Sequence, residues 1–154
     1  MSVPVFKTSL VIAVVAVAVI AGAWYFLAPP DATPVALSGR IEGITGYPSE
    51  FNPEQTVCAQ SVTDAALVRC VDAPEQEGSV APTFSIKVPA GRYTVYAILK
   101  DPADLGLTEQ KKAYWSAFVT CGFLASCADH SPLEVIVSSG ATVTGIQPHD
   151  WYTN

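Results

Sequence analysis

Two acid–histidine pairs are the residues of this sequence whose side chains could most readily do chemistry. Asp129 precedes His130, and His149 precedes Asp150. An imidazole beside a carboxylate can bind a metal ion or transfer a proton near neutral pH. The spacing of the two pairs does not require them to meet, and isolated histidines in loops usually make only local hydrogen bonds. We therefore predict no metal site and no cofactor, and keep these four residues as the candidate ligands should a metal bind.

The sequence carries no other pattern typical of a catalytic centre. Ser116, Ser126 and Ser131 lack the glycine-flanked context of a nucleophile elbow. The net charge is −6, and the lysines and arginines are scattered, which argues against binding to the phosphates of nucleic acid. We expect a protein that is not an enzyme and does not bind nucleic acid.

Four cysteines allow three disulfide pairings. If strands at 56–62 and 67–71 pair about a turn near Asp64, Cys58 lies directly opposite Cys70, where a cross-strand disulfide can form. The short separation of the other two then favours Cys121–Cys127. These gaps do not suit a zinc site, and disulfides persist in exported compartments.

Aromatic residues gather outside the expected strands. They are Tyr114, Trp115, Phe118, Phe123, Trp151 and Tyr152. Exposed aromatic side chains are enriched at recognition surfaces, but a small domain also needs them to cover its core. We favour the covering role, and keep a subset as candidates for binding a partner: Tyr114, Trp115, Phe123, Trp151 and Tyr152.

An uncharged, apolar stretch of twenty residues occupies positions 9–28. As a helix, this length spans the ~30 Å hydrocarbon core of a bilayer. Lys7 precedes it, so the positive-inside rule places the N-terminus in the cytoplasm. Trp24, Tyr25 and Phe26 lie where an aromatic belt meets the membrane interface. We predict a single-pass anchor through which the protein contacts the lipid bilayer.

A cleaved signal peptide remains the alternative, because Ala21-Gly22-Ala23 offers small residues at a cleavage site. Both interpretations send the rest of the chain into the periplasm or outside the cell. The expected organisation is a cytoplasmic segment at 1–8, the transmembrane helix at 9–28, a proline-rich linker at 29–34 and an extracytoplasmic domain at 35–154.

The strongest strand signal in that domain is Thr83–Lys100, where apolar and polar residues alternate on both sides of Pro89-Ala90-Gly91. This pattern predicts two half-buried strands joined in an antiparallel hairpin. A four-residue loop would pair Val88 with Tyr93 and Ile86 with Val95, which gives the hairpin one apolar face.

Further strands are expected at 35–44, 56–62, 67–71, 133–137 and 141–146. Residues 101–132 are the least regular part, and within them we expect a helix over Leu107–Thr120 with Thr108 as its N-cap. Residues 147–154 form a short tail. Seven short strands with proline and glycine turns indicate an antiparallel β-sandwich.

These segments also resemble a known family. The sequence Leu37-Ser38-Gly39-Arg40-Ile41, the Pro-Ala-Gly-x-Tyr hairpin and the closing Val143-x-x-Ile146 are similar to the carboxypeptidase regulatory-like domain. The resemblance implies a transthyretin-like fold, a prealbumin- or Ig-like sandwich in which residues 101–132 are an insertion carrying a short helix. Members of this family are mostly accessory, adhesive or sugar-associated modules, so the resemblance implies a fold and no reaction.

Three functions follow as hypotheses. The first is a membrane-anchored, outward-facing, non-catalytic sandwich that binds an envelope protein or serves as an accessory subunit of a membrane complex. The second is a carbohydrate- or cell-wall-binding module that uses the aromatic loops. The third is a metal-binding protein that uses His130 and His149.

Overall fold

A computed structural model describes residues 38–49, 52–74 and 80–152 of the chain. This part of the chain is mainly β, as the sequence indicates. Its strands are β1 (Ser38–Ile44), β2 (Gln55–Ser61), β3 (Val68–Ala73), β4 (Thr83–Pro89), β5 (Gly91–Leu99), β6 (Lys112–Tyr114), β7 (Glu134–Val137) and β8 (Thr142–Ile146). The helical segments are a 3-10 turn, η1 (Pro102–Leu105), and a single α-helical turn, α2 (Ala117–Thr120).

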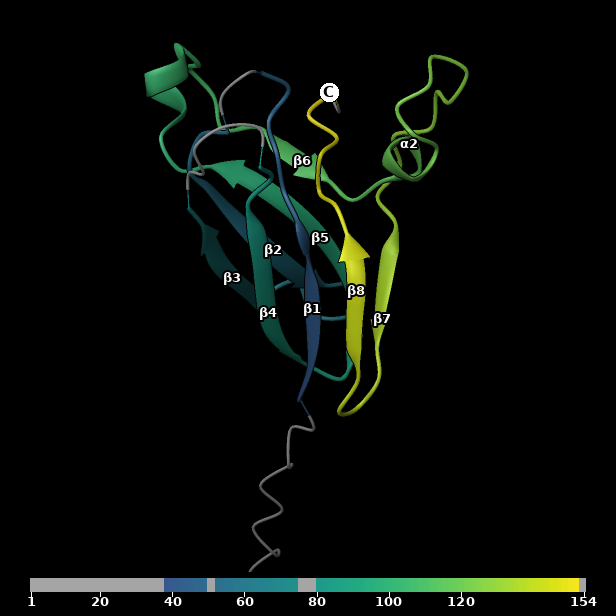
Figure 1. Cartoon of the computed structure of the whole chain (residues 1–154). Coiled ribbons are helices and arrows are strands. Elements are labelled where there is room, and N and C mark those ends of the chain that lie inside the picture. The colour runs from purple at the N-terminus through teal and green to yellow at the C-terminus, as the bar shows by residue number, and fades with distance from the viewer. Residues whose placement is uncertain (1–37, 50–51, 75–79, 153–154) are drawn as a thin grey trace, which may run out of the picture. The chain divides into compact units, whose positions relative to one another are not determined.

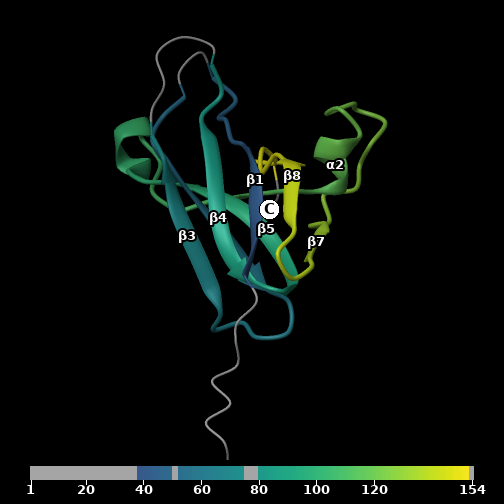
Figure 2. The same ribbon diagram turned by 60° about the horizontal axis from the view of Figure 1, so that its bottom comes forward.

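The strands form two sheets that pack face to face (Figure 1). The first sheet has the order β4-β1-β8, and Figure 2 shows these strands side by side. The second has the order β3-β2-β5, and both β6 and β7 pair with β5. Because β2 pairs with residues 93–99 of β5, it occupies one edge of that strand, and β6 and β7 follow one another along the other edge.

The core lies between the two sheets and is built by alternation within each strand. In β4, Phe84, Ile86 and Val88 are buried, while the residues between them are exposed. Val57 and Val95 lie on the facing sheet and are fully buried. Side chains that point to the same face of a strand recur every second residue, so this pattern fixes the inward face.

The predicted hairpin between β4 and β5 is wrong. Val88 pairs with Gly39 of β1, whereas Tyr93 pairs with Val135 of β7 and with Ser61 of β2. The chain therefore crosses from one sheet to the other at Ala90. Alternation identifies the inward face of each strand, but a hairpin and a crossing between sheets bury that face equally well.

A hydrogen bond holds this crossing. The Tyr93 hydroxyl donates to the Pro89 carbonyl at 2.7 Å, and the Tyr93 ring is buried beneath the corner. The Pro-Ala-Gly-x-Tyr segment is therefore a corner between sheets, in which Tyr93 fastens the end of β4 to the start of β5.

The expectation of seven antiparallel strands needs two corrections. The described residues contain eight strands, and β8 pairs with β1 in parallel. The extra strand, β6, falls within Leu107–Thr120, where we expected a helix with Thr108 as its N-cap. Only Ala117–Thr120 is α-helical there. Ala113 pairs with Ala97 of β5, which supplies backbone hydrogen bonds and buries both side chains. Tertiary contacts therefore override the local helical pattern.

Predictions about the N-terminal segment fall outside the described residues. These are the cytoplasmic segment, the anchor at 9–28 with its interfacial Trp24, Tyr25 and Phe26, and the linker. In the described ranges, no helix is long and apolar enough to cross a membrane.

Both predicted disulfides are confirmed. Cys58 and Cys70 are directly opposed in the β2–β3 ladder, with their Cα atoms 4.1 Å apart. Cys121 and Cys127 close a loop that follows α2, with their Cα atoms 6.4 Å apart. One disulfide thus joins paired strands, and the other shapes a loop outside the sheets.

Candidate functional site

A pocket of about 460 Å³ opens at one end of the sandwich. This is the end at which β1 and β8 finish and β4 begins, as the pairing of Ile44 with Thr83 shows. We call it the open end. Aromatic rings from three segments line the pocket: Tyr47, Phe118, Phe123, Trp151 and Tyr152. A pocket of this size falls in the range of about 300–1,000 Å³ that is usual for ligand sites.

The floor of the pocket is the C-terminal tail folded against the loop after β1. Trp151 is only 7% exposed, and its Nε1–H donates to the Gly46 carbonyl at 2.7 Å. The Tyr47 ring meets the Trp151 ring edge-on, with centroids 5.1 Å apart. Burial of the indole and satisfaction of its one donor fix the tail in place, and Trp151 covers the core as we favoured.

His149 contributes the most unusual polar atom of the site. Its Nε2 is buried and has no hydrogen-bond partner. Burial lowers the pKa of His149 below its usual value, although a hydrogen bond with the Thr45 backbone opposes that shift. The ring is therefore neutral at pH 7.

Gly46 makes room for this ring. A Cβ atom at position 46 would lie 3.2 Å from His149 Nε2 and 3.5 Å from Asn52 Oδ1. A side chain there would crowd the His149 ring, whereas its contact with Asn52 would be of ordinary van der Waals length, so glycine keeps the pocket wall open beside His149.

The outer wall comes from α2 and the loop closed by Cys121–Cys127. Phe123 packs edge-on against Phe118, with centroids 5.5 Å apart, and has a positive φ of 60°. Phe123 is 44% exposed and the adjacent Leu124 is 58% exposed. Tyr152, from the tail, is 59% exposed and completes the rim.

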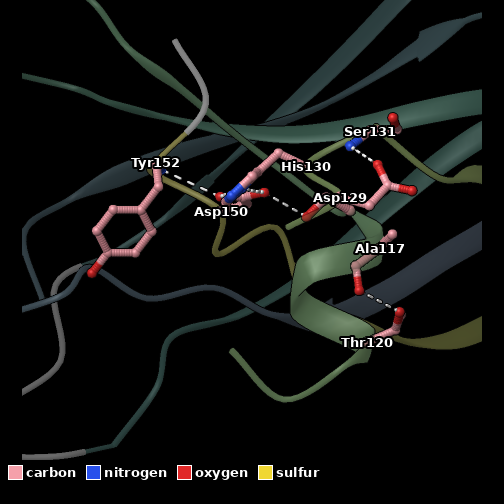
Figure 3. A network of polar contacts seen from close by, with 8 residues as sticks. Ala117, Thr120, Asp129, His130, Ser131, Asp150 and Tyr152 are labelled. Atoms are coloured by element: carbon pink, nitrogen blue, oxygen red, sulfur yellow. Dashed lines mark hydrogen bonds and ion pairs between the residues drawn. The ribbon is translucent and has the colours of Figure 1, made fainter. Parts of the chain in front are cut away.

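Behind the rim, Asp150 is fully buried in a polar cluster (Figure 3). It accepts hydrogen bonds from Ser116 Oγ at 2.6 Å, from His130 Nδ1 at 2.9 Å and from the Tyr152 backbone N–H at 3.3 Å. Three segments that are distant in the sequence meet at this carboxylate. The cluster therefore ties the tail to α2 and to the segment before β7.

The same cluster has the composition of a Ser-His-Asp triad but not its connectivity. In a catalytic triad, histidine takes the proton of the serine hydroxyl and aspartate orients the histidine. Here Ser116 Oγ donates to Asp150 itself, so His130 is not positioned as the base of that hydroxyl. The arrangement supports packing of the tail, not nucleophilic catalysis.

The four candidate metal ligands do not form one site. Asp150 and His130 meet, but His149 lies in the pocket, and the exposed Asp129 accepts a hydrogen bond from the Ser131 backbone at 2.8 Å. Hydrogen bonds from Ser131 hold the pKa of Asp129 below its usual value. Among the described residues, no group of three His, Cys, Asp or Glu side chains could hold a metal ion.

Of the five candidate partner-binding aromatics, Phe123 and Tyr152 are exposed and Trp151 is buried. Tyr114 and Trp115 are half-buried, and Trp115 packs against the core. Sequence reasoning missed Tyr47, although it too is an aromatic residue in a loop, between Gly46 and Pro48. Extending the search for loop aromatics to residues 45–55 would have found it.

Comparisons with protein-family models, with curated proteins and with solved structures gave no match for this chain. The resemblance to transthyretin-like domains therefore stays a prediction. Function has to be inferred from the pocket and its surroundings.

Proposed function

We propose that this protein is a membrane-anchored, outward-facing and non-catalytic β-sandwich that binds a protein partner through its open end. The single observation that carries the proposal is the aromatic pocket with its exposed apolar rim. Aromatic residues are enriched at the centres of protein interfaces, where they bury a large area in few side chains.

The pocket and the start of β1 lie at different ends of the sandwich. The described part of the sandwich begins at Ser38, which pairs with Pro89, and β1 runs from there to the open end. The pocket therefore lies at the opposite end of the sandwich from Ser38, the first described residue. A partner bound at the open end would not contact the start of β1.

The charges at the open end support a partner held by apolar contacts. Among the described residues that line the pocket there is no Asp, Glu, Lys or Arg, although the whole chain carries a net charge of −6. Phe123, Leu124 and Tyr152 project beside it. Depletion of charge around exposed aromatic side chains is the composition that distinguishes the core of a protein interface.

Site-specific photocrosslinking in intact membranes tests the proposal. A benzophenone side chain at position 152 is expected to capture one protein in a discrete adduct. The matched control places it at position 87, where the exposed Lys87 lies near the opposite end of β4. Equal capture from both positions, or none from position 152, would contradict binding through the open end.

A further inference from the structure

The pocket contains a hydrogen-bond acceptor that the protein itself leaves unused. His149 Nε2 is buried without a partner, and His149 is one of the residues that line the pocket. A buried polar atom that stays unpaired costs free energy, so it is an informative feature of a binding site.

The tautomer of His149 follows from its other hydrogen bond. The Thr45 backbone N–H is already bonded to the Pro82 carbonyl, so the Thr45 group that contacts the imidazole is its carbonyl oxygen. A carbonyl can only accept, and Nε2 has no partner, so Nδ1 carries the hydrogen that is donated. In the neutral ring Nε2 is then a bare acceptor, and only a donor can satisfy it.

The remaining lining restricts what that donor can belong to. Most of the described lining residues are aromatic, and none of the described ones is charged. An ammonium or guanidinium group desolvated among these residues would find no counter-charge, which disfavours lysine and arginine. A planar aromatic group, by contrast, gains edge-on and offset contacts with the surrounding rings.

Resting on the proposed function, we propose that the pocket binds an aromatic side chain of the partner that carries one ring N–H donor, a tryptophan indole, with this N–H donated to His149 Nε2. Indole has a donor and no acceptor, so its single polar group would be satisfied by the unpaired acceptor of His149. A phenylalanine ring would leave Nε2 unpaired. A sugar would bring several hydroxyls for which the aromatic walls offer few partners.

Phe123 lies beside the imidazole that carries this acceptor. Its ring lies roughly parallel to that of His149, with centroids 6.4 Å apart, and it belongs to the exposed disulfide loop. In the proposed complex, the exposed Phe123 ring would also pack on the bound indole.

Nuclear magnetic resonance of the full chain in detergent micelles, with ¹⁵N-labelled histidine, tests the proposal. The probes are N-acetyl-tryptophanamide and its 1-methylindole analogue, which keeps the ring and lacks the donor. We expect the first to move the His149 Nε2 resonance and to bind about tenfold more tightly than the second. In His149→Phe the two probes should bind equally, whereas Phe123→Leu should weaken both and keep the preference.

Equal affinity of the two probes for the wild-type chain would overturn the proposal, as would no binding of either at millimolar concentration. Saturation of the pocket by a neutral oligosaccharide, with displacement of the tryptophan probe, would also overturn it and favour a sugar ligand. Failure here with a discrete crosslink from position 152 would leave the proposed function standing. Loss of that crosslink would instead remove the proposed function.

Discussion

In the strand framework, apolar side chains are buried by simple alternation, whereas at the open end a few specific polar and aromatic contacts hold the loops. Ile41 and Val95 are surrounded by other core residues of both sheets. The tail, in contrast, depends on one indole donor to Gly46 and on one carboxylate, Asp150. Substitutions that remove buried side-chain volume should therefore destabilise the framework most. At the open end, substitutions that remove a hydrogen-bond partner should matter most.

The largest effect should come from truncation in the framework. Ile41 is fully buried in β1, between β4 and β8, so Ile41→Ala removes well-packed methyl groups and leaves a cavity. We expect a loss of about 3–4 kcal/mol in the free energy of unfolding, measured by urea denaturation. A loss below about 1 kcal/mol would show that the framework adapts to cavities and would break the comparison.

The two disulfides compare the regions directly. Cys58–Cys70 closes a loop of separation 12 and Cys121–Cys127 one of separation 6. In the chain-entropy model, replacing each pair by serine should cost about 3 and about 2 kcal/mol, respectively. Only loss of the second pair should also weaken probe binding, because it shapes the pocket wall. Equal weakening of binding by both replacements would contradict this division.

Asp150→Ala should remove the acceptor of the open-end cluster and leave Ser116 and His130 without it. We expect a loss of about 2 kcal/mol in the free energy of unfolding. The control is Asp129→Ala, at an exposed carboxylate that contacts only its own loop, with an expected change within about 0.5 kcal/mol. Similar costs for the two variants would remove the structural role assigned to Asp150.

Acidification should have a smaller effect on the free energy of unfolding. The pKa of His149 is lowered in the folded state by burial, so below its unfolded pKa of about 6.5 the unfolded chain binds more protons. The stability that the neutral ring contributes is thus fully present above about pH 6.5 and is lost as the pH falls toward the folded pKa. Urea midpoints for the wild type and His149→Phe should diverge in this window, with the wild type losing more stability. Parallel curves would contradict burial of a neutral imidazole.

The smallest change in stability is expected at the rim. Leu124 is exposed on the disulfide loop, so Leu124→Ser should alter the free energy of unfolding by less than about 0.5 kcal/mol. Crosslinking from position 152 should nevertheless decrease, because the substitution removes apolar area from the proposed interface. Unchanged crosslinking would confine the interface to the pocket itself.

The sequence was most informative about the framework. Alternation identified the buried faces of β4 and β5, and register about Asp64 placed Cys58 opposite Cys70. It could not show that β4 and β5 belong to different sheets, because partner choice depends on contacts with distant strands. The helix expected from Leu107 failed for the same reason, since pairing with β5 decided the conformation of residues 112–114.

At the open end, the sequence identified candidate residues but not the contacts between them. His130 and Asp150 were recognised as candidates, yet their contact arises only when the tail returns to the loop before β7. The acceptor at His149 depends on what its two nitrogens meet in three dimensions. Contacts between loop residues produce no periodic pattern in a sequence, so they could not be predicted from it.

The position of β1 also has a mechanical consequence. It lies between β4 and β8 and is hydrogen-bonded to both. Tension applied at Ser38 and resisted by a molecule held at the opposite end would load both ladders in shear, so that many bonds share the force at once. An edge strand under the same tension would be held by one ladder alone. Detachment of β1 under such tension would require both ladders to break.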